Sequence, residues 1–204
     1  MPDKDPGGAR GALTDGIAVA GPPPVFLVVG PPAVGKTTTS RALAARFARS
    51  VHIPVDDLRH MVVSGLALPA TEWADEIVRQ IALARGVAIR MAEDYAASGF
   101  AVVLDDFPDP FLLAEYAGFA ARPRTHRILL LPPQEVALRR NRARSGDGPE
   151  GDYIEGALPF AYAIVEPYVD LLRAEGWVVL DTSDLGVEET ADAILRLTGE
   201  APGR

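Results

Sequence analysis

The chain has 204 residues, of which 48% are hydrophobic and 24% charged, a composition typical of one globular domain rather than a disordered or fibrous protein. It has no cysteine, which excludes disulfides and thiolate metal sites, and its formal net charge of -8 disfavours the binding of long nucleic acid. No apolar run reaches the roughly 18 to 20 residues of a membrane-spanning helix, and the N-terminus lacks the pattern of a signal peptide, so we expect a cytoplasmic protein without membrane contact.

Residues 1–24 contain many prolines and glycines with little periodicity, which predicts a flexible leader ahead of one domain spanning 25–200. In this domain, short apolar runs alternate with segments of helical periodicity. The predicted strands are 25–30, 51–57, 100–107, 126–133 and 177–183. The predicted helical segments are 36–50, 58–65, 71–99, 110–120 and 186–197. The segment 134–176 is predicted to form an Arg-rich helix, a Gly/Asp/Pro loop and a second helix interrupted near Pro167.

Five apolar strands that alternate with helices predict an α/β fold, a five-stranded parallel sheet with helices on both faces. In such sheets, ligands bind beyond the carboxyl ends of the strands. We therefore expect the polar segments that follow the strands to lie along one edge. These segments include Asp56 and Asp57, Asp105 and Asp106, and residues 181–184.

The segment after the first strand has the spacing G-x-x-x-x-G-K-T. Between a buried strand and a helix, this spacing is typical of a phosphate-binding loop, where backbone N–H groups surround a phosphate, the lysine neutralises its charge and the threonine hydroxyl ligates Mg²⁺. Because Pro31 and Pro32 have no N–H, the cradle is expected to start at Ala33. We predict a site for ATP and Mg²⁺, with GTP left open, formed by Gly30, Ala33, Val34, Gly35, Lys36, Thr37 and Thr38.

Lys36 is one of only two lysines among the 20 basic residues of the chain, and the other is Lys4. Arginine cannot reproduce the compact ammonium of a lysine at a phosphate. The retention of Lys36 in an arginine-rich chain supports a constrained role for it.

Two acids end the apolar run at 101–106. An acid at this place is suited to bind Mg²⁺, directly or through water, together with Thr37. We assign Asp105 to the metal and Asp106 to the substrate, although consecutive strand residues face opposite ways and the sequence does not decide which acid points inward. The alternative is that these acids cap the next helix or face solvent.

The stretch 53–62 contains Asp56, Asp57 and Arg59. A carboxylate beside the transferred phosphate can accept the proton of an attacking hydroxyl, and an arginine three residues later can hold substrate or phosphate. We therefore consider Asp56 and Arg59 as catalytic candidates, with Asp57 and Arg59 at the substrate. The alternative is a helix cap followed by a solvated arginine.

Arg139, Arg140, Arg142 and Arg144 follow the fourth predicted strand, ahead of a glycine-rich stretch. Phosphoryl transfer requires cations that screen developing negative charge, and glycines allow a lid to move. We expect a lid at about 139–157. Arg140 and Arg144 are its catalytic candidates, and Arg140 is also a candidate to bind the nucleotide. The sequence does not decide which arginine reaches the phosphates. A solvated helix face is the alternative.

The remaining polar and aromatic residues carry weaker signals. His52, His60 and His126 lack the spacing of metal ligands, so we expect them to be structural or to lie on the surface. Tyr153 is expected in the loop of the lid, where it can reach a ligand.

The motifs "GPPAVGKTT", "VDDLRHMV" and "VVLDDF", together with the Arg-rich lid, resemble the P-loop kinases of the AAA-33 or zeta-toxin-like group. This group includes chloramphenicol phosphotransferase-like enzymes and the kinase domains of polynucleotide kinases. The resemblance implies that Asp56 is the catalytic base and that Arg59 lies at the substrate phosphate. Val55 stands where the polynucleotide enzymes have a basic residue, which weakens the resemblance to them.

These features together predict an ATP-dependent kinase that transfers the γ-phosphoryl group to a hydroxyl of a small metabolite or antibiotic. A polynucleotide or nucleoside 5′-kinase is a second hypothesis, and a non-catalytic nucleotide-gated regulator is a third. A homodimer is left open.

Overall fold

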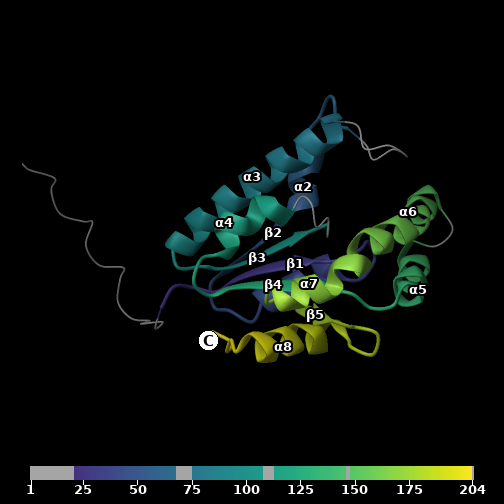
Figure 1. Ribbon diagram of the computed structural model, residues 1–204. Helices are drawn as coiled ribbons and strands as arrows, with labels where there is room; N and C mark the ends of the chain where they lie inside the picture. The colour runs from purple at the N-terminus through teal and green to yellow at the C-terminus, as the bar shows by residue number, and fades with distance from the viewer. Residues whose placement is uncertain (1–20, 68–74, 108–112, 146–147, 204) are drawn as a thin grey trace, which may run out of the picture.

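The computed structural model describes residues 21–67, 75–107, 113–145 and 148–203, so most of the predicted leader lies outside the described part (Figure 1). Five strands form one parallel sheet in the order β2-β3-β1-β4-β5, which confirms the predicted architecture. The strands are β1 (Val25–Val29), β2 (Ser50–Pro54), β3 (Ala101–Asp106), β4 (Thr125–Leu130) and β5 (Val178–Leu180).

Helices cover both faces of the sheet (Figure 1). The first face packs against α3 (Asp75–Ala97), the short helices η1 (Leu113–Tyr116) and α4 (Ala117–Ala120), and α7 (Val169–Ala174). The second face packs against α1 (Lys36–Ala44) and α8 (Val187–Thr198). None of the helices in the described part of the chain is long and apolar enough to cross a membrane.

The central strands β1 and β3 are buried along their whole length, because each has helices on both sides. Their residues alternate between two hydrophobic clusters. Leu27 and Leu104 belong to the cluster under α3, whereas Phe26 and Val103 belong to the cluster over α1 and α8. Whether a residue of these strands packs under α3 or over α1 and α8 therefore depends on its place in the alternation along the strand.

Helix α3 presents a row of alanines to the sheet. Ala84, Ala88, Ala92 and Ala96 are spaced by four residues and are all buried in the first cluster. Residues at this spacing lie on one face of a helix, and their small side chains allow close approach to the strands. Gly86 does not interrupt the helix, which runs unbroken for 23 residues.

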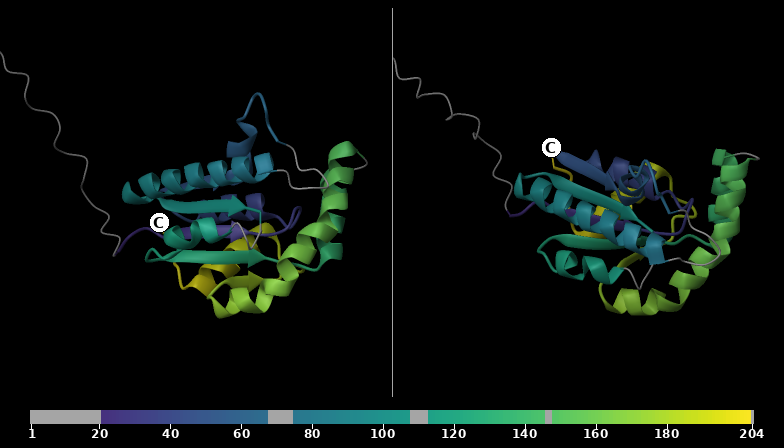
Figure 2. Two further views of the ribbon diagram at one scale, coloured as in Figure 1. Left: turned by 45° about the horizontal axis from the view of Figure 1, so that its top comes forward. Right: turned by 90° about the horizontal axis from the view of Figure 1, so that it is seen from above.

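The strand arrows point toward the end of the molecule where α6 lies (Figure 2). At this end, α2 (Val55–His60) follows β2, and α5 (Gln134–Ser145) follows β4. Helix α5 and helix α6 (Pro149–Val165) form a hairpin, in which the Asn141 side-chain amide donates to the Gly151 carbonyl at 2.8 Å and Arg142 pairs with Glu155 at 2.6 Å. As predicted, the chain is interrupted at Pro167, which lies in the 3₁₀ helix η2 (Glu166–Tyr168).

Some predicted boundaries are wrong. Strand β2 ends at Pro54 rather than at residue 57, so Asp56 and Asp57 lie in the first turn of α2. Carboxylates are favoured there because they interact with the positive end of the helix dipole. Tyr153 lies in α6 and not in a loop, because Pro149 at the first helical position starts that helix early.

An ion pair is buried between β3 and α3. The Arg85 side chain is fully buried, and its Nε lies 2.5 Å from Oδ2 of Asp106. The Tyr116 hydroxyl donates to the same oxygen at 3.0 Å, and the Phe107 N–H donates to the other carboxylate oxygen at 2.7 Å. Burial alone would lower the pKa of Arg85, but the charge of Asp106 outweighs it and raises that pKa, so the arginine stays charged.

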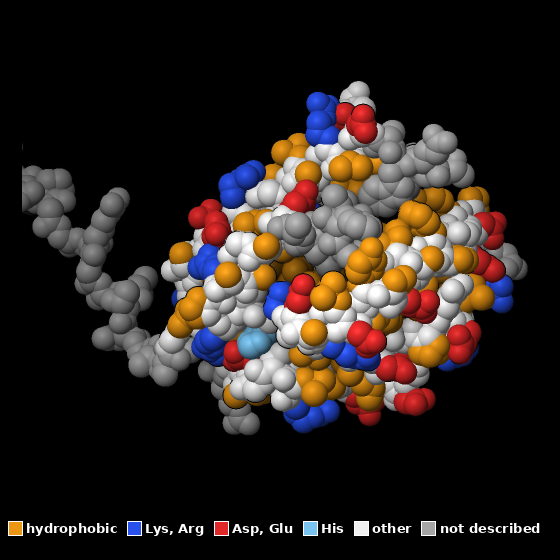
Figure 3. Space-filling model, in the orientation of Figure 1, with side chains coloured by type: hydrophobic (Ala, Val, Ile, Leu, Met, Phe, Trp, Pro, Cys, Tyr) orange, Lys and Arg blue, Asp and Glu red, His pale blue; other side chains and the backbone are white. Residues whose placement is uncertain are grey.

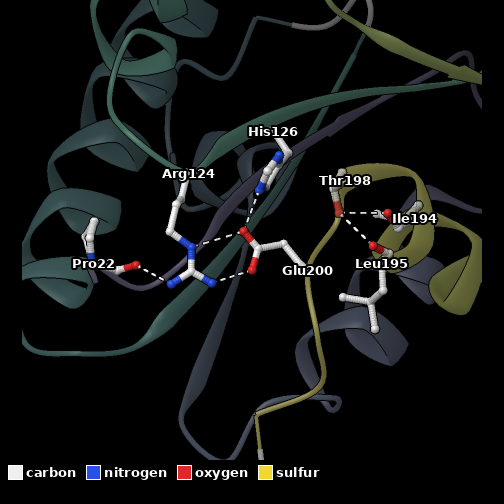
Figure 4. A network of polar contacts seen from close by, with 7 residues as sticks. All are labelled: Pro22, Arg124, His126, Ile194, Leu195, Thr198 and Glu200. Atoms are coloured by element: carbon white, nitrogen blue, oxygen red, sulfur yellow. Dashed lines mark hydrogen bonds and ion pairs between the residues drawn. The ribbon is translucent and has the colours of Figure 1, made fainter. Parts of the chain in front are cut away.

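A polar cluster joins both ends of the domain at the amino end of β4 (Figure 4). Glu200, which follows α8, accepts hydrogen bonds from Arg124 and, at 2.8 Å, from Nε2 of His126. Arg124 also donates to the Pro22 carbonyl at 2.7 Å. Burial alone would raise the pKa of Glu200, but the hydrogen bonds and charges of Arg124 and His126 outweigh it and lower that pKa.

We predict that Asp106→Asn lowers the free energy of unfolding by about 3 to 5 kcal/mol, because it leaves Arg85 charged in the core with only the longer, 3.7 Å ion pair to the partly exposed Glu115. Urea denaturation measures the loss. Asparagine can still accept from the Phe107 N–H through its one carbonyl oxygen, and its amide can donate to the Tyr116 hydroxyl, so the double variant Arg85→Met/Asp106→Asn should recover most of the stability. A single variant within about 1 kcal/mol of the parent would show that the pair contributes little.

We predict that Glu200→Gln costs about 2 kcal/mol of unfolding free energy at pH 7, because charge-assisted hydrogen bonds are lost. The pKa of Glu200 is below its ordinary value of 4.5, so this contribution is present above that pH and disappears as the pH falls through the folded-state pKa. Urea denaturation at pH 7 and pH 3 measures the difference.

The matched control for this prediction is Glu188→Gln, because Glu188 forms an exposed ion pair with Arg46. Such a pair contributes about 0 to 1 kcal/mol. If both variants lost the same unfolding free energy, Glu200 would contribute no more than an exposed ion pair.

Candidate functional site

The loop between β1 and α1 has a backbone that only particular residues allow. A Cβ atom at Gly30 would lie 2.6 Å from the Leu130 carbonyl oxygen, so a side chain at this position is excluded by close approach. Gly35 has a φ of 97°, in the left-handed region that glycine adopts readily, and α1 begins at the next residue. The loop therefore ends at a helix N-terminus, where free N–H groups bind an anion.

Lys36 lies at the centre of a group of charges. Its side chain is half-buried and its ammonium donates to the Pro31 carbonyl at 3.0 Å. Burial lowers the pKa of Lys36, while the negative charges of Asp56, Asp105 and Asp106 partly offset this effect. Acids from two places at the carboxyl edge of the sheet, the start of α2 and the end of β3, thus lie near the loop.

Asp105 faces the phosphate-binding loop. The Thr37 hydroxyl lies 3.4 Å from Oδ1 of Asp105, and Nε2 of His52 lies 2.5 Å from Oδ2. Mg²⁺ prefers oxygen ligands and binds through one or two protein oxygens together with phosphates and water, so the Thr37 and Asp105 pair fits this ion. Among the described residues, no three acidic or histidine side chains gather to form a larger metal site.

Asp106 faces the opposite layer. It is 3% exposed and engaged by Arg85 and Tyr116 under α3. The structure therefore brings Asp105, but not Asp106, to the face of the phosphate-binding loop. Asp106 has a buried partner where the sequence suggested a contact with substrate.

Asp56 and Asp57 are both exposed in the first turn of α2. The charge of Asp56 acts on Lys36 and also on Tyr153 of α6, whose pKa is raised by burial, lowered by Arg59 and raised by Asp56. Asp56 thus follows β2 at the carboxyl edge of the sheet, and its charge influences both the phosphate-binding loop and α6. Asp57 is not among the charges that act most strongly on Lys36 and does not contribute to the pKa shift of Tyr153.

Arg59 is half-buried beside the loop that follows α2. Its Nη1 lies 3.5 Å from the Ala67 carbonyl oxygen, and its Nε has no hydrogen-bond partner among the described residues. Gln80 of α3 binds the same loop through two hydrogen bonds. Its side chain donates to the Gly65 carbonyl at 2.8 Å and accepts from the Ala67 N–H at 2.9 Å. Arg59 therefore lies against this loop with its Nε shielded from solvent.

Helix α5 contributes two arginines with different roles. Arg140 donates to the hydroxyl and the carbonyl of Thr182 at 2.9 and 2.5 Å, and to the Val34 carbonyl at 3.2 Å. It thus joins α5, the segment after β5 and the phosphate-binding loop. Arg144 is exposed, and its charge acts on Lys36. Of the other lid arginines, Arg139 is exposed and Arg142 pairs with Glu155.

A pocket of about 270 Å³ opens beside these arginines. It is lined by residues 33–35 of the loop, by Arg140 and Arg144, and by Thr182 and residues 185–187 after β5. Its position next to the phosphate-binding loop and at the carboxyl edge of the sheet is suited to the base and sugar of a nucleotide.

His52 and Arg85 contact the two acids of β3, yet the sequence does not mark either as a site residue. The sequence favours a structural or surface role for His52 and carries no motif at Arg85. The partner of His52 is 53 residues away and that of Arg85 is 21 residues away. The acids Asp105 and Asp106 were the only available signal, because buried acids require partners.

Residues 25–158 match the AAA-33 family, which is described as an AAA domain. No curated protein matches the sequence. Among solved structures, the tunicamycin resistance protein of Deinococcus radiodurans has 16% identity and a TM-score of 0.59, with coverage of 89% of this chain and 99% of that chain. A shikimate kinase from Acinetobacter baumannii in complex with shikimate has 24% identity and a TM-score of 0.59, with coverage of 86% and 92%.

A sugar kinase from Janibacter sp. HTCC2649 has 19% identity and a TM-score of 0.61, with coverage of 89% of this chain and 97% of that chain. At these identities the likeness concerns the fold alone. The family match covers more than half of the sequence and includes the phosphate-binding loop, Asp56 and Asp105. The chain therefore belongs to the AAA-33 family and has the α/β fold of the P-loop kinases.

Proposed function

We propose that the protein is an ATP-dependent phosphotransferase that moves the γ-phosphoryl group to a hydroxyl of a small molecule. The observation that carries this proposal is the position of Asp56. Its carboxylate is exposed, yet its charge acts on Lys36 of the phosphate-binding loop. An acid between the donor site and open solvent is suited to activate an acceptor hydroxyl.

In the donor site, different residues bind the phosphates, the metal, and the base and sugar of the nucleotide. The N–H groups of residues 33–38 bind the phosphates, and the Lys36 ammonium leaves the Pro31 carbonyl to neutralise them. Thr37 and Asp105 hold Mg²⁺, which supplies charge neutralisation on the phosphate oxygens. The pocket beside Arg140 receives the base and sugar.

The transfer step uses Asp56 as general base. Its carboxylate takes the proton of the acceptor hydroxyl while the hydroxyl oxygen bonds to the γ-phosphorus. The bond from that phosphorus to the bridging oxygen breaks, and ADP leaves with the electron pair. Arg140 is held by Thr182 at the nucleotide, so the exposed Arg144 of the lid at about 139–157 is the arginine that screens the transferred charge.

A small acceptor is favoured over a polynucleotide. Val55, just before the proposed base, is apolar and buried, and the chain carries a net charge of -8. On the face that Figure 3 shows, acidic and basic side chains of the described residues are interspersed rather than gathered in a basic stripe. The shikimate kinase and the sugar kinase among the similar structures are named for small hydroxylated molecules. The charges of Arg59 and Asp56 both act on Tyr153, which supports an acceptor site near these three residues.

We predict that ATP with Mg²⁺ protects Lys36 from a lysine-selective acylating reagent. The lowered pKa of Lys36 leaves more of its amine neutral and reactive near pH 8, and bound phosphates would engage that amine. Mass spectrometry of the labelled peptides measures the protection. Lys4, the only other lysine, is the internal control and should stay equally reactive with and without ATP. Equal labelling of Lys36 in both conditions would contradict nucleotide binding at the loop.

We predict that Asp56→Asn reduces phosphoryl transfer by about 10²- to 10⁴-fold and leaves the affinity for ATP near normal, because the general base is lost and the loop is intact. A screen of ADP release against alcohols, nucleosides and antibiotics first identifies an acceptor, which is then used to measure turnover.

Asp57→Asn is the matched control and should reduce turnover much less, because Asp57 is not among the charges that act most strongly on Lys36. Unchanged turnover in Asp56→Asn would remove Asp56 from the mechanism. ADP release that no small hydroxyl compound stimulates would favour a nucleotide-gated regulator. An oligonucleotide acceptor with strong salt dependence would favour a polynucleotide kinase.

A further inference from the structure

The two carboxylate oxygens of Asp105 have different partners on different elements. Oδ1 lies 3.4 Å from the Thr37 hydroxyl on α1, and Oδ2 lies 2.5 Å from Nε2 of His52 on β2. The contact with Thr37 is long for a hydrogen bond to a hydroxyl, whereas the contact with His52 is short. The carboxylate is therefore held mainly from the side of His52.

The sheet register explains how His52 reaches this acid. Strands β2 and β3 run parallel, with Pro54 beside Asp105 and His52 beside Val103. His52 is two residues before Pro54, so both point to the same face of β2. Val103 and Asp105 likewise share one face of β3, and Val103 belongs to the cluster over α1. His52, Asp105 and Thr37 thus meet in one layer.

Both side chains of the pair are largely removed from water. The His52 side chain is 12% exposed and that of Asp105 is 6% exposed. A carboxylate in such a place needs a hydrogen-bond donor, and Nε2 of His52 supplies one. With Oδ2 occupied, the oxygen left for another ligand is Oδ1, which is the oxygen beside Thr37.

We propose that His52 is a positioning residue that orients Asp105, so that Oδ1 is presented to the metal bound with the nucleotide. This inference rests on the proposed function, in which Thr37 and Asp105 hold Mg²⁺. His52 acts through Asp105 and does not touch the metal. Residues of this kind, which hydrogen-bond a ligating carboxylate, typically change metal affinity by about 10- to 100-fold when they are replaced.

Two substitutions separate the hydrogen bond from the bulk of the ring. In His52→Gln the side-chain amide nitrogen occupies nearly the position of Nε2, so the contact with Asp105 is retained. In His52→Asn the amide nitrogen corresponds to Nδ1 and falls short of Asp105. His126→Asn makes the same chemical change at the amino end of β4, in the cluster with Glu200, away from the phosphate-binding loop.

The experiment titrates Mn²⁺ into each full-length variant in the presence of ADP and measures free Mn²⁺ by electron paramagnetic resonance. We expect the apparent Kd for Mn²⁺ to rise by about 10- to 100-fold in His52→Asn and by less than about 3-fold in His52→Gln and His126→Asn. The affinity for ADP in EDTA should be the same in all variants, which shows that the loop is folded.

A double-variant cycle tests whether His52 works through Asp105. We expect Asp105→Asn to weaken Mn²⁺ binding by itself, and His52→Asn to add less than about 2-fold in that background, because residues that act as a unit are not additive. If Asp105→Asn weakens binding and His52→Asn does not, the inference about His52 fails alone. If Asp105→Asn leaves Mn²⁺ binding unchanged, the proposed metal role of Asp105 fails and the inference fails with it.

Discussion

Successive residues of a β-strand point to opposite faces of the sheet, and at the end of β3 both of these residues are aspartates. Asp105 enters the layer of α1 and Asp106 the layer of α3. Each buried charge then requires a donor from its own layer, and the chain supplies His52 and Thr37 on one side and Arg85 and Tyr116 on the other. On one face these contacts tie α3 and η1 to the end of β3, and on the other they tie the neighbouring strand β2 and, more loosely, α1 to it.

The parallel sheet also explains why several charges lie around Lys36. Because the carboxyl ends of neighbouring strands meet at one edge, Asp56 after β2 and Asp105 on β3 both act on the ammonium after β1. A triphosphate brings several negative charges to this place and thereby changes the balance between the lysine and the two acids.

The phosphate-binding loop was predictable because its requirements are local: glycine where a side chain would clash or φ is positive, and then Lys36 and Thr37 at the helix start. The pairing of His52 with Asp105 was not predictable from spacing, because it depends on the register of two strands. The assignment of Asp105 and Asp106 to faces depends on which helices cover each side of the sheet. Asp56 was placed at a strand end, although Val55 already begins a helix.

Arg124 binds the Pro22 carbonyl and the Glu200 carboxylate, so the first and last parts of the domain meet on one side chain at the amino ends of the strands. The phosphate-binding loop lies at the opposite ends of those strands. A circular permutation that joins these two parts would need only a short linker and would leave the loop intact.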